Sequence, residues 1–268
     1  MPSYLITGAS RGIGLAFLYN ISSNAKNVVI GLVRNVAASE AKVASWNRSN
    51  IHFVQGDLEN YESLKSAAAA TAKITGGGID YLIANAGLVE GGFDSFSVLG
   101  NDPEKLTASL TRQFSVNVTG NIHLFNLFMP LVLKGTVKKV VAISSGMGDM
   151  ELVRKYNISE DAPYSISKAA VNMAVAKFSA EYAKDGVLFL AMSPGVVGTD
   201  VYADLSEEDQ QKLGIMSQKF AAYAPKFKGP ITPEESVKAV LSVVEASSVA
   251  NGDGGAFYSH LGKGEKWL

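Results

Sequence analysis

Short apolar runs alternate with helical periods from one end of this chain to the other, and this alternation constrains the fold most strongly. The strand-like runs occur at 3–7, 27–33, 51–54, 80–84, 138–143 and 188–192, with a weaker run at 256–258. The helical periods occur at about 12–23, 37–46, 61–75, 104–133, 162–184 and 233–248. Because each crossover helix must cover a face of the sheet, we predict mostly parallel strands with helices on both faces. The expected structure is an α/β, doubly wound, seven-stranded sheet in one domain spanning 1–268.

Composition excludes several functional classes. Hydrophobic residues at 47% and charged residues at 18% are typical of a globular chain with an ample core. A net charge of −1 without a basic block gives no nucleic-acid-binding surface and no surface for anionic membranes. The absence of cysteine excludes disulfides, thiolate catalysis and Cys-ligated zinc. The chain shows neither a signal peptide nor an apolar run near the ~18 residues that span a bilayer, so we expect a cytoplasmic protein.

A glycine-rich turn, Thr7-Gly8-Ala9-Ser10-Arg11-Gly12-Ile13-Gly14, lies between the first strand-like run and the first helical period. Such a turn lets backbone N–H groups approach a phosphate closely, and the helix N-terminus favours its negative charge. The spacing is Gly-x-x-x-Gly-x-Gly, which differs from the general dinucleotide fingerprint. The turn therefore predicts a phosphate site, and a tight glycine turn without a ligand is the alternative.

A tyrosine and a lysine lie four positions apart in Tyr164-Ser165-Ile166-Ser167-Lys168. On a helix these two side chains share a face. A phenol titrates near pH ~10, and a neighbouring cation favours the phenolate and lowers that pKa toward useful acid–base chemistry. The pair alone is weak evidence, because this spacing is common on exposed helices.

Further motifs occur in a fixed order along the chain. They are Asn85-Ala86-Gly87, Ser115-Val116-Asn117-Val118, Ser144-Ser145 and Pro194-Gly195-Val196-Val197-Gly198-Thr199. With the glycine turn and the Tyr164–Lys168 pair, they resemble the motif set of the short-chain dehydrogenase/reductase family over nearly the whole chain. The pattern is similar to the carbonyl-reductase branch that includes sniffer-like and fungal ketoreductase-like proteins. The resemblance implies a Rossmann-type fold and reduction of a small-molecule carbonyl by a nicotinamide cofactor.

The resemblance also implies a catalytic set of Asn117, Ser145, Tyr164 and Lys168. Tyr164 would protonate the developing alkoxide, and Lys168 would hold the nicotinamide ribose and keep the tyrosine pKa low. Ser145 would hydrogen-bond the carbonyl oxygen, and Asn117 would anchor a water that relays protons toward Lys168. Ser144 remains an alternative to Ser145, which we favour because small residues follow it.

The same resemblance assigns a long set of residues to the cofactor. They are Gly8, Ser10, Arg11, Gly12, Ile13, Gly14, Arg34, Asp57, Leu58, Asn85, Ala86, Gly87, Val116, Tyr164, Lys168, Pro194, Gly195, Val197 and Thr199. Asp57 would bond the adenine amino group.

Cofactor choice depends on the end of the second strand-like run. A site that prefers NAD places an acidic residue there to accept bonds from the ribose hydroxyls. This chain has Val33 followed by Arg34, and a guanidinium matches the 2′-phosphate of NADP. Arg11 could supply a second cation, although both arginines could also be ordinary surface residues. We predict that NADP(H) is preferred and that NAD(H) is possible.

Two segments depart from the family pattern and limit what the resemblance implies about the substrate. An insertion at about 149–161 is expected to form a substrate loop, and the stretch at about 199–230 a lid. The apolar stripe of this lid consists of Tyr202, Leu205, Leu213, Ile215, Met216, Phe220, Tyr223 and Phe227. If the stripe lines the pocket, the substrate is an aromatic or bulky ketone, aldehyde or diketone; core packing of a small helix pair is the alternative.

Other functions are less consistent with the residues. His52, His123 and His260 are scattered without ligand spacing, so no metal site is expected. An alcohol dehydrogenase working in the oxidative direction and a non-catalytic NADP-binding sensor remain alternatives. The family often forms dimers or tetramers through its two long central helices, so a homodimer or homotetramer through about 104–133 and 162–184 is possible. Phe125, Phe128, Met173 and Phe178 could belong to that interface or to the core.

Overall fold

One sheet of seven parallel strands organises the computed structural model, which describes residues 1–90, 93–199 and 205–268. The strands are β1 (Ser3–Thr7), β2 (Val28–Val33), β3 (Ile51–Gln55), β4 (Tyr81–Ala84), β5 (Lys139–Ile143), β6 (Leu188–Ser193) and β7 (Phe257–Ser259). They lie in the order β3-β2-β1-β4-β5-β6-β7, and every pairing is parallel. The chain reverses its direction of travel across the sheet between β1 and β4, which is where doubly wound sheets bind ligands. The predicted α/β fold is confirmed.

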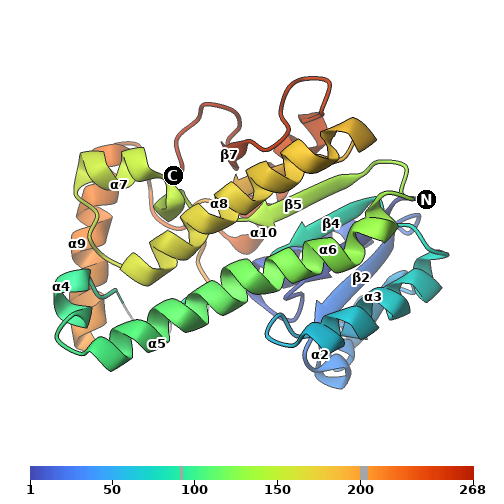
Figure 1. Cartoon of the computed structure of the whole chain (residues 1–268), viewed down its shortest axis with the longest axis horizontal. Helices are drawn as coiled ribbons and strands as arrows, with labels where there is room; N and C mark the ends of the chain where they lie inside the picture. The colour runs from blue at the N-terminus through green and yellow to red at the C-terminus, as the bar shows by residue number, and fades with distance from the viewer. Residues whose placement is uncertain (91–92, 200–204) are drawn as a thin grey trace.

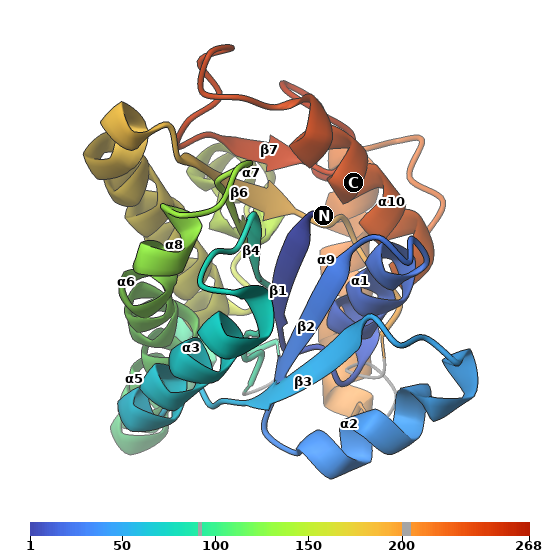
Figure 2. The ribbon, with the colours of Figure 1, turned by 90° about the vertical axis from the view of Figure 1, so that its right-hand side faces the viewer.

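Helices cover both faces of the sheet (Figure 2). The helices are α1 (Gly12–Ser22), α2 (Val36–Val43), α3 (Tyr61–Thr75), α4 (Phe96–Leu99), α5 (Pro103–Phe114), α6 (Asn121–Val132), α7 (Met150–Tyr156), α8 (Ala162–Tyr182), α9 (Glu207–Tyr223) and α10 (Pro233–Ala246). Successive strand residues alternate between the faces, so Leu5 packs under α3, α6 and α8 while Ile6 packs under α1 and α10. Burial of these two apolar layers fixes the register of the strands.

The long helix predicted at about 104–133 contains a local change of pitch. The segment η2 (Ser115–Gly120) is a π-helix between α5 and α6, and Asn117 lies inside it. The three pieces form one continuous rod beside α8 (Figure 1). π-turns within α-helices occur frequently at functional sites. The sequence pattern gave no sign of this change.

A third apolar cluster lies at one end of the molecule, where α4, α7 and α9 gather (Figure 1). Helix α7 occupies the first half of the stretch at about 149–161. The stretch at about 199–230 contains one long helix, α9, which buries Met216 and Phe220. Residues 200–204, including Tyr202 of the predicted stripe, lie outside the described part of the chain.

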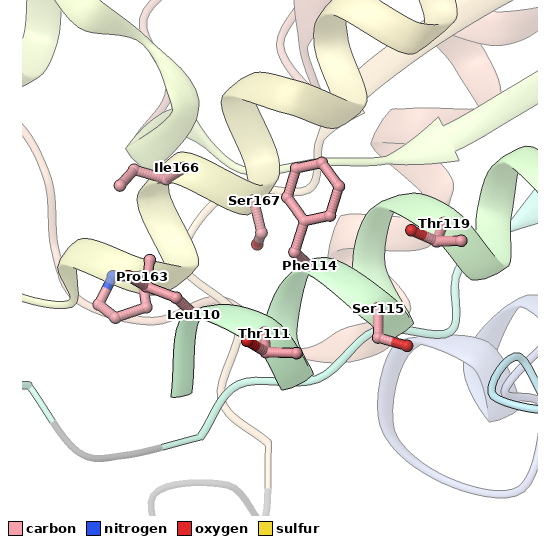
Figure 3. Close-up of a pocket in the computed structure, with 8 residues that line it drawn as sticks. All are labelled: Leu110, Thr111, Phe114, Ser115, Thr119, Pro163, Ile166 and Ser167. Atoms are coloured by element: carbon pink, nitrogen blue, oxygen red, sulfur yellow. The ribbon is translucent and has the colours of Figure 1, made fainter. Parts of the chain in front are cut away.

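The outer face of α5 and α8 carries a small pocket of about 440 Å³ (Figure 3). Phe114 and Ile166 line it and are 46% and 44% exposed. Met173, further along α8, is also exposed, whereas Phe125, Phe128 and Phe178 are buried in the core. Of these six side chains, Phe114, Ile166 and Met173 are therefore accessible to another chain. The predicted homo-oligomer stays a prediction.

Candidate active site

A cleft of about 900 Å³ opens where the carboxyl ends of the strands meet the turns that follow them. The turns after β1, β2, β3, β4, β5 and β6 all contribute to its wall. The cleft therefore includes the point between β1 and β4 at which the sheet order reverses. It is large enough for a dinucleotide with a small substrate beside it.

Most of the predicted site residues line this one cleft, although they come from segments far apart in the chain. Those that line it are Gly8, Ser10, Arg11, Gly12, Ile13, Arg34, Asp57, Leu58, Asn85, Ala86, Gly87, Val116, Ser145, Tyr164, Pro194, Gly195, Val197 and Thr199. Gly14, Asn117 and Lys168 lie behind its wall.

The glycine turn is shaped by contacts that admit no side chain. Gly8 and Gly12 have φ angles of 67° and 54°, in the left-handed region that glycine adopts without strain. A Cβ on Gly14 would lie 2.2 Å from the Gly8 carbonyl oxygen, so α1 can begin this close to β1 only at a glycine. No side chain caps the first turn of α1. Its N–H groups thus remain available to a phosphate, and the turn fits the pyrophosphate of a nicotinamide dinucleotide.

Positively charged side chains surround the end of the cleft beside the glycine turn and the end of β2. Val33 is buried at the end of β2, while Arg34 and Arg11 are exposed at the cleft wall. Lys42 of α2 donates a hydrogen bond of 3.0 Å to the Ser10 carbonyl and adds a third positive charge, which no sequence motif had indicated. Asp57 also lines the cleft, and its carboxylate accepts a bond from the Glu59 amide. This positively charged part of the cleft fits a phosphate group in addition to the phosphates that the glycine turn would hold.

Tyr164 and Lys168 meet on the first turns of α8, as their spacing predicted. The Lys168 ammonium lies 5.5 Å from the centre of the Tyr164 ring and donates a 2.9 Å hydrogen bond to the Ile143 carbonyl. Its side chain is buried, and burial lowers the pKa of the ammonium to about 8. A lysine with that pKa can hold or release a proton near neutral pH.

The two serines after β5 have different surroundings. Ser144 is buried, and its hydroxyl donates a 3.4 Å bond to the Lys168 backbone carbonyl. Ser145 is half-buried, and its hydroxyl oxygen accepts a 3.2 Å bond from the Met147 amide. Within the described residues, the Ser145 hydroxyl donates to no acceptor. Its O–H bond can therefore point into the cleft.

Asn117 connects three elements beneath the cleft. It is fully buried, and its amide nitrogen donates to the Leu88 carbonyl at 2.8 Å and to the Ser167 hydroxyl at 2.9 Å. Its side-chain oxygen accepts from the Leu88 amide at 2.6 Å. The Ser167 hydroxyl in turn donates to the Tyr164 carbonyl at 2.7 Å. The side chain therefore fixes the loop after β4 against the turn of α8 that carries the tyrosine.

The substrate end of the cleft is mostly apolar and includes Phe220 of the predicted stripe together with residues that no motif had indicated. Met147, Leu152 and Phe220 line it, as do Trp267 and Leu268 from the end of the chain. The Trp267 indole donates to the Asp149 carboxylate at 2.7 Å, and its backbone amide donates to the Tyr223 hydroxyl at 3.0 Å. Another polar residue in this wall, Asp161, was assigned no role from the sequence. Nothing in the local pattern marks residues that meet only after folding.

Within residues 1–90, 93–199 and 205–268, no three His, Asp or Glu side chains gather closely enough to hold a metal ion. In the same ranges, no helix has the length and apolar character needed to span a bilayer.

Comparison with known proteins places these features in a family. A family model described as short chain dehydrogenase matches residues 3–210. The short chain dehydrogenase virK of Hypocrea virens is 51% identical over the full length of both chains. The NADPH-bound carbonyl reductase from chicken fatty liver is 25% identical, with a TM-score of 0.79 over 100% of this chain and 99% of that one. The carbonyl reductase Sniffer of D. melanogaster shares the fold, with a TM-score of 0.75 and 21% identity over 97% of each chain.

The family model covers most of the chain, and the site geometry agrees with the motifs that carried the resemblance. The chain belongs to the short-chain dehydrogenase/reductase family and is a carbonyl-reductase-like oxidoreductase.

Proposed function

We propose that this protein reduces an aromatic or bulky ketone or aldehyde to an alcohol with NADPH. One observation carries the proposal: Ser145 and Tyr164 line the same cleft as the glycine turn, and Lys168 lies directly behind the tyrosine. A carbonyl bound between the two hydroxyls would be held at the end of the nucleotide site. The family membership and the NADPH-bound carbonyl reductase among the similar structures support this proposal.

A nicotinamide cofactor held in the cleft would provide the hydride for the carbonyl carbon. Ser145 donates a hydrogen bond to the carbonyl oxygen and fixes it near the phenol. Tyr164 donates its proton to that oxygen as negative charge develops. Lys168 stabilises the phenolate left behind, and Asn117 keeps this turn of α8 in position through Ser167. We also propose that a water beside Asn117 relays protons toward Lys168.

The two serines allow a matched test of this assignment. Ser145→Ala is expected to lower kcat/KM for carbonyl reduction by about 10²- to 10³-fold, because it removes the hydrogen bond to the developing oxyanion. Ser144→Ala is expected to change kcat/KM less than about tenfold, because the Ser144 hydroxyl bonds the Lys168 backbone. Steady-state kinetics on both variants measure the difference. A larger loss of kcat/KM in Ser144→Ala than in Ser145→Ala would assign the catalytic hydroxyl to Ser144.

NADPH preference is proposed from the positive end of the cleft. Arg34→Ala is expected to weaken NADPH binding by about 10- to 100-fold and NADH binding by less than about threefold, since only NADPH carries the 2′-phosphate. Titration of each cofactor by fluorescence measures both affinities. Arg154→Ala is a matched control, because it removes an exposed guanidinium outside the cleft. Equal losses for the two cofactors would contradict the phosphate contact.

The substrate class is proposed from the apolar wall around the catalytic end. Met216 and Phe220 of α9 and Leu152 of α7 contribute to that wall, so we propose that the segments at about 149–161 and 199–230 act as substrate loop and lid. The first experiment is oxidation of NADPH and of NADH with aromatic aldehydes, diketones, quinones and bulky cyclic ketones. Turnover with NADPH supports the proposal. Tight NADPH binding without turnover of any of these compounds would favour a sensor, and faster alcohol oxidation with NAD would favour a dehydrogenase.

A further inference from the structure

A buried carboxyl group without an evident structural role lies in the substrate end of the cleft. Asp161 precedes the first residue of α8 and is 6% exposed. It lines the same cleft as Tyr164, three residues further on. Its Oδ1 atom is buried and has no hydrogen-bond partner among the described residues. A buried polar atom left in this state costs about 1–3 kcal/mol, so its retention needs an explanation.

The usual structural roles of an aspartate do not account for this side chain. Aspartate at a helix N-cap ordinarily accepts a bond from the first turn, but the Asp161 side chain caps nothing. Its backbone is in the left-handed region, with φ of 56°, and its carbonyl accepts bonds of 3.0 Å from both the amide and the hydroxyl of Ser165. The backbone of Asp161 is therefore held in place, whereas its carboxyl group remains available to a ligand.

The neighbouring charges are paired with one another. Glu160 precedes Asp161 in the chain, and its carboxylate binds the Lys219 ammonium at 2.6 Å. The Asp94 backbone carbonyl accepts a 3.4 Å bond from the Ala162 amide, next to Asp161. The cations bound to the Asp94 carboxylate are Lys212 and Lys105. No cation within the described residues forms an ion pair with Asp161, and burial alone raises the pKa of its carboxyl group to about 7.

We propose that Asp161 is a specificity-determining residue that hydrogen-bonds a hydroxyl group of the carbonyl substrate, so that the substrates of this enzyme are hydroxylated ketones or aldehydes. The inference rests on the proposed carbonyl reduction and deepens it. A fixed polar group in a largely apolar wall selects between ligands. An analogue without a matching group leaves the buried carboxyl group without a hydrogen bond, and this weakens its binding.

A hydroxyl group suits this carboxyl group better than other polar groups do. A hydroxyl both donates and accepts, so it can pair with the ionised and with the protonated carboxyl. Both forms are populated near pH 7, because the pKa is about 7. A cationic ligand would bring its own desolvation cost into the apolar wall formed by Phe93, Met147 and Leu152.

The test compares acetophenone with its ortho-, meta- and para-hydroxy derivatives on three proteins. The wild type is expected to prefer at least one hydroxylated ketone over acetophenone by roughly 10- to 100-fold in kcat/KM. Asp161→Gly removes the carboxyl group and tolerates the positive φ, so it is expected to reduce that preference to about twofold by lowering kcat/KM for the hydroxylated ketone. Asp161→Asn keeps a hydrogen-bonding group of the same shape, accepts the left-handed conformation, and is expected to retain most of the preference.

A binding measurement separates this inference from the proposed reaction. The same ketones are titrated into the NADP⁺-bound protein, which cannot reduce them, and binding is followed by the fluorescence of Trp267 in the cleft wall. Selective loss of affinity for the hydroxylated ketone in Asp161→Gly supports the inference. Equal kcat/KM and equal affinity for all four ketones in the wild type overturn it, even if every ketone is reduced and the reductase assignment stands. This wild-type comparison decides the matter also if Asp161→Gly fails to fold.

Discussion

Replacing Tyr164 with phenylalanine is expected to lower kcat for carbonyl reduction by roughly 10²- to 10⁴-fold, while NADPH affinity stays within about threefold. In the proposed mechanism, the phenol hydroxyl gives its proton to the substrate oxygen, and phenylalanine lacks that hydroxyl. The ring itself packs against the apolar cluster that includes Met147 and Leu152, and phenylalanine preserves that packing. The loss should therefore fall on kcat, measured with saturating NADPH, and not on the stability of the fold.

Tyr19→Phe provides the matched control, because it makes the same substitution on an exposed ring that contacts Trp46 edge-to-face and lies beneath the Arg48 guanidinium. Its kcat is expected to equal that of the wild type. Turnover by Tyr164→Phe at even a tenth of the wild-type rate would show that another group supplies the proton.

Replacing Lys168 with methionine is expected to change activity and stability in opposite directions. Methionine has a similar length without the charge, so kcat should fall by roughly 10²- to 10³-fold through loss of the cation beside the phenol. The shift of the Lys168 pKa from 10.5 to about 8 corresponds to roughly 3 kcal/mol of destabilisation. The orphaned Ile143 carbonyl offsets part of this gain, so the free energy of unfolding should rise by about 1 kcal/mol at pH 7.

The pH dependence of this stability difference has a definite sign. The pKa of Lys168 is lower in the folded chain than in the unfolded chain, so the penalty for the buried ammonium is fully present below about pH 8. It disappears as the pH rises from about 8 toward 10.5, where the lysine is neutral in both states. Urea unfolding of the two proteins at pH 7 and pH 9.5 measures the difference, and the stability advantage of the variant at pH 7 should be lost at pH 9.5. A variant less stable than the wild type at pH 7 would show that the ammonium stabilises the fold.

The sequence predicted the architecture because periodicity is a local property. The alternation of strand-like runs and helical periods, together with glycines at 8, 12 and 14, determines strand, tight turn and helix over a few residues at a time. The shared face of Tyr164 and Lys168 followed from helical spacing for the same reason. Every strand predicted from the pattern is present in the sheet.

The departures arose where tertiary contacts decide the outcome. The stretch at about 149–161 is expected from its sequence to be a loop, yet α7 forms there because Leu152 and the following Ile158 are buried against Met216 and Phe220. Helical spacing also could not separate Phe125 and Phe178, which are buried, from Met173, which is exposed. Burial depends on what lies opposite a side chain, and a local pattern contains no such information.

The sequence by itself indicated the family and its class of chemistry, through a glycine turn, a tyrosine–lysine pair and a serine that are each recognised from residues a few positions apart. Only the tertiary structure decided the surroundings of those groups. It buried Lys168, directed the Ser144 and Ser145 hydroxyls differently, and brought Trp267 and Asp161 into the cleft wall. Desolvation and hydrogen-bond partners are properties of the folded chain, because they depend on which atoms distant segments bring within a few ångströms of a group.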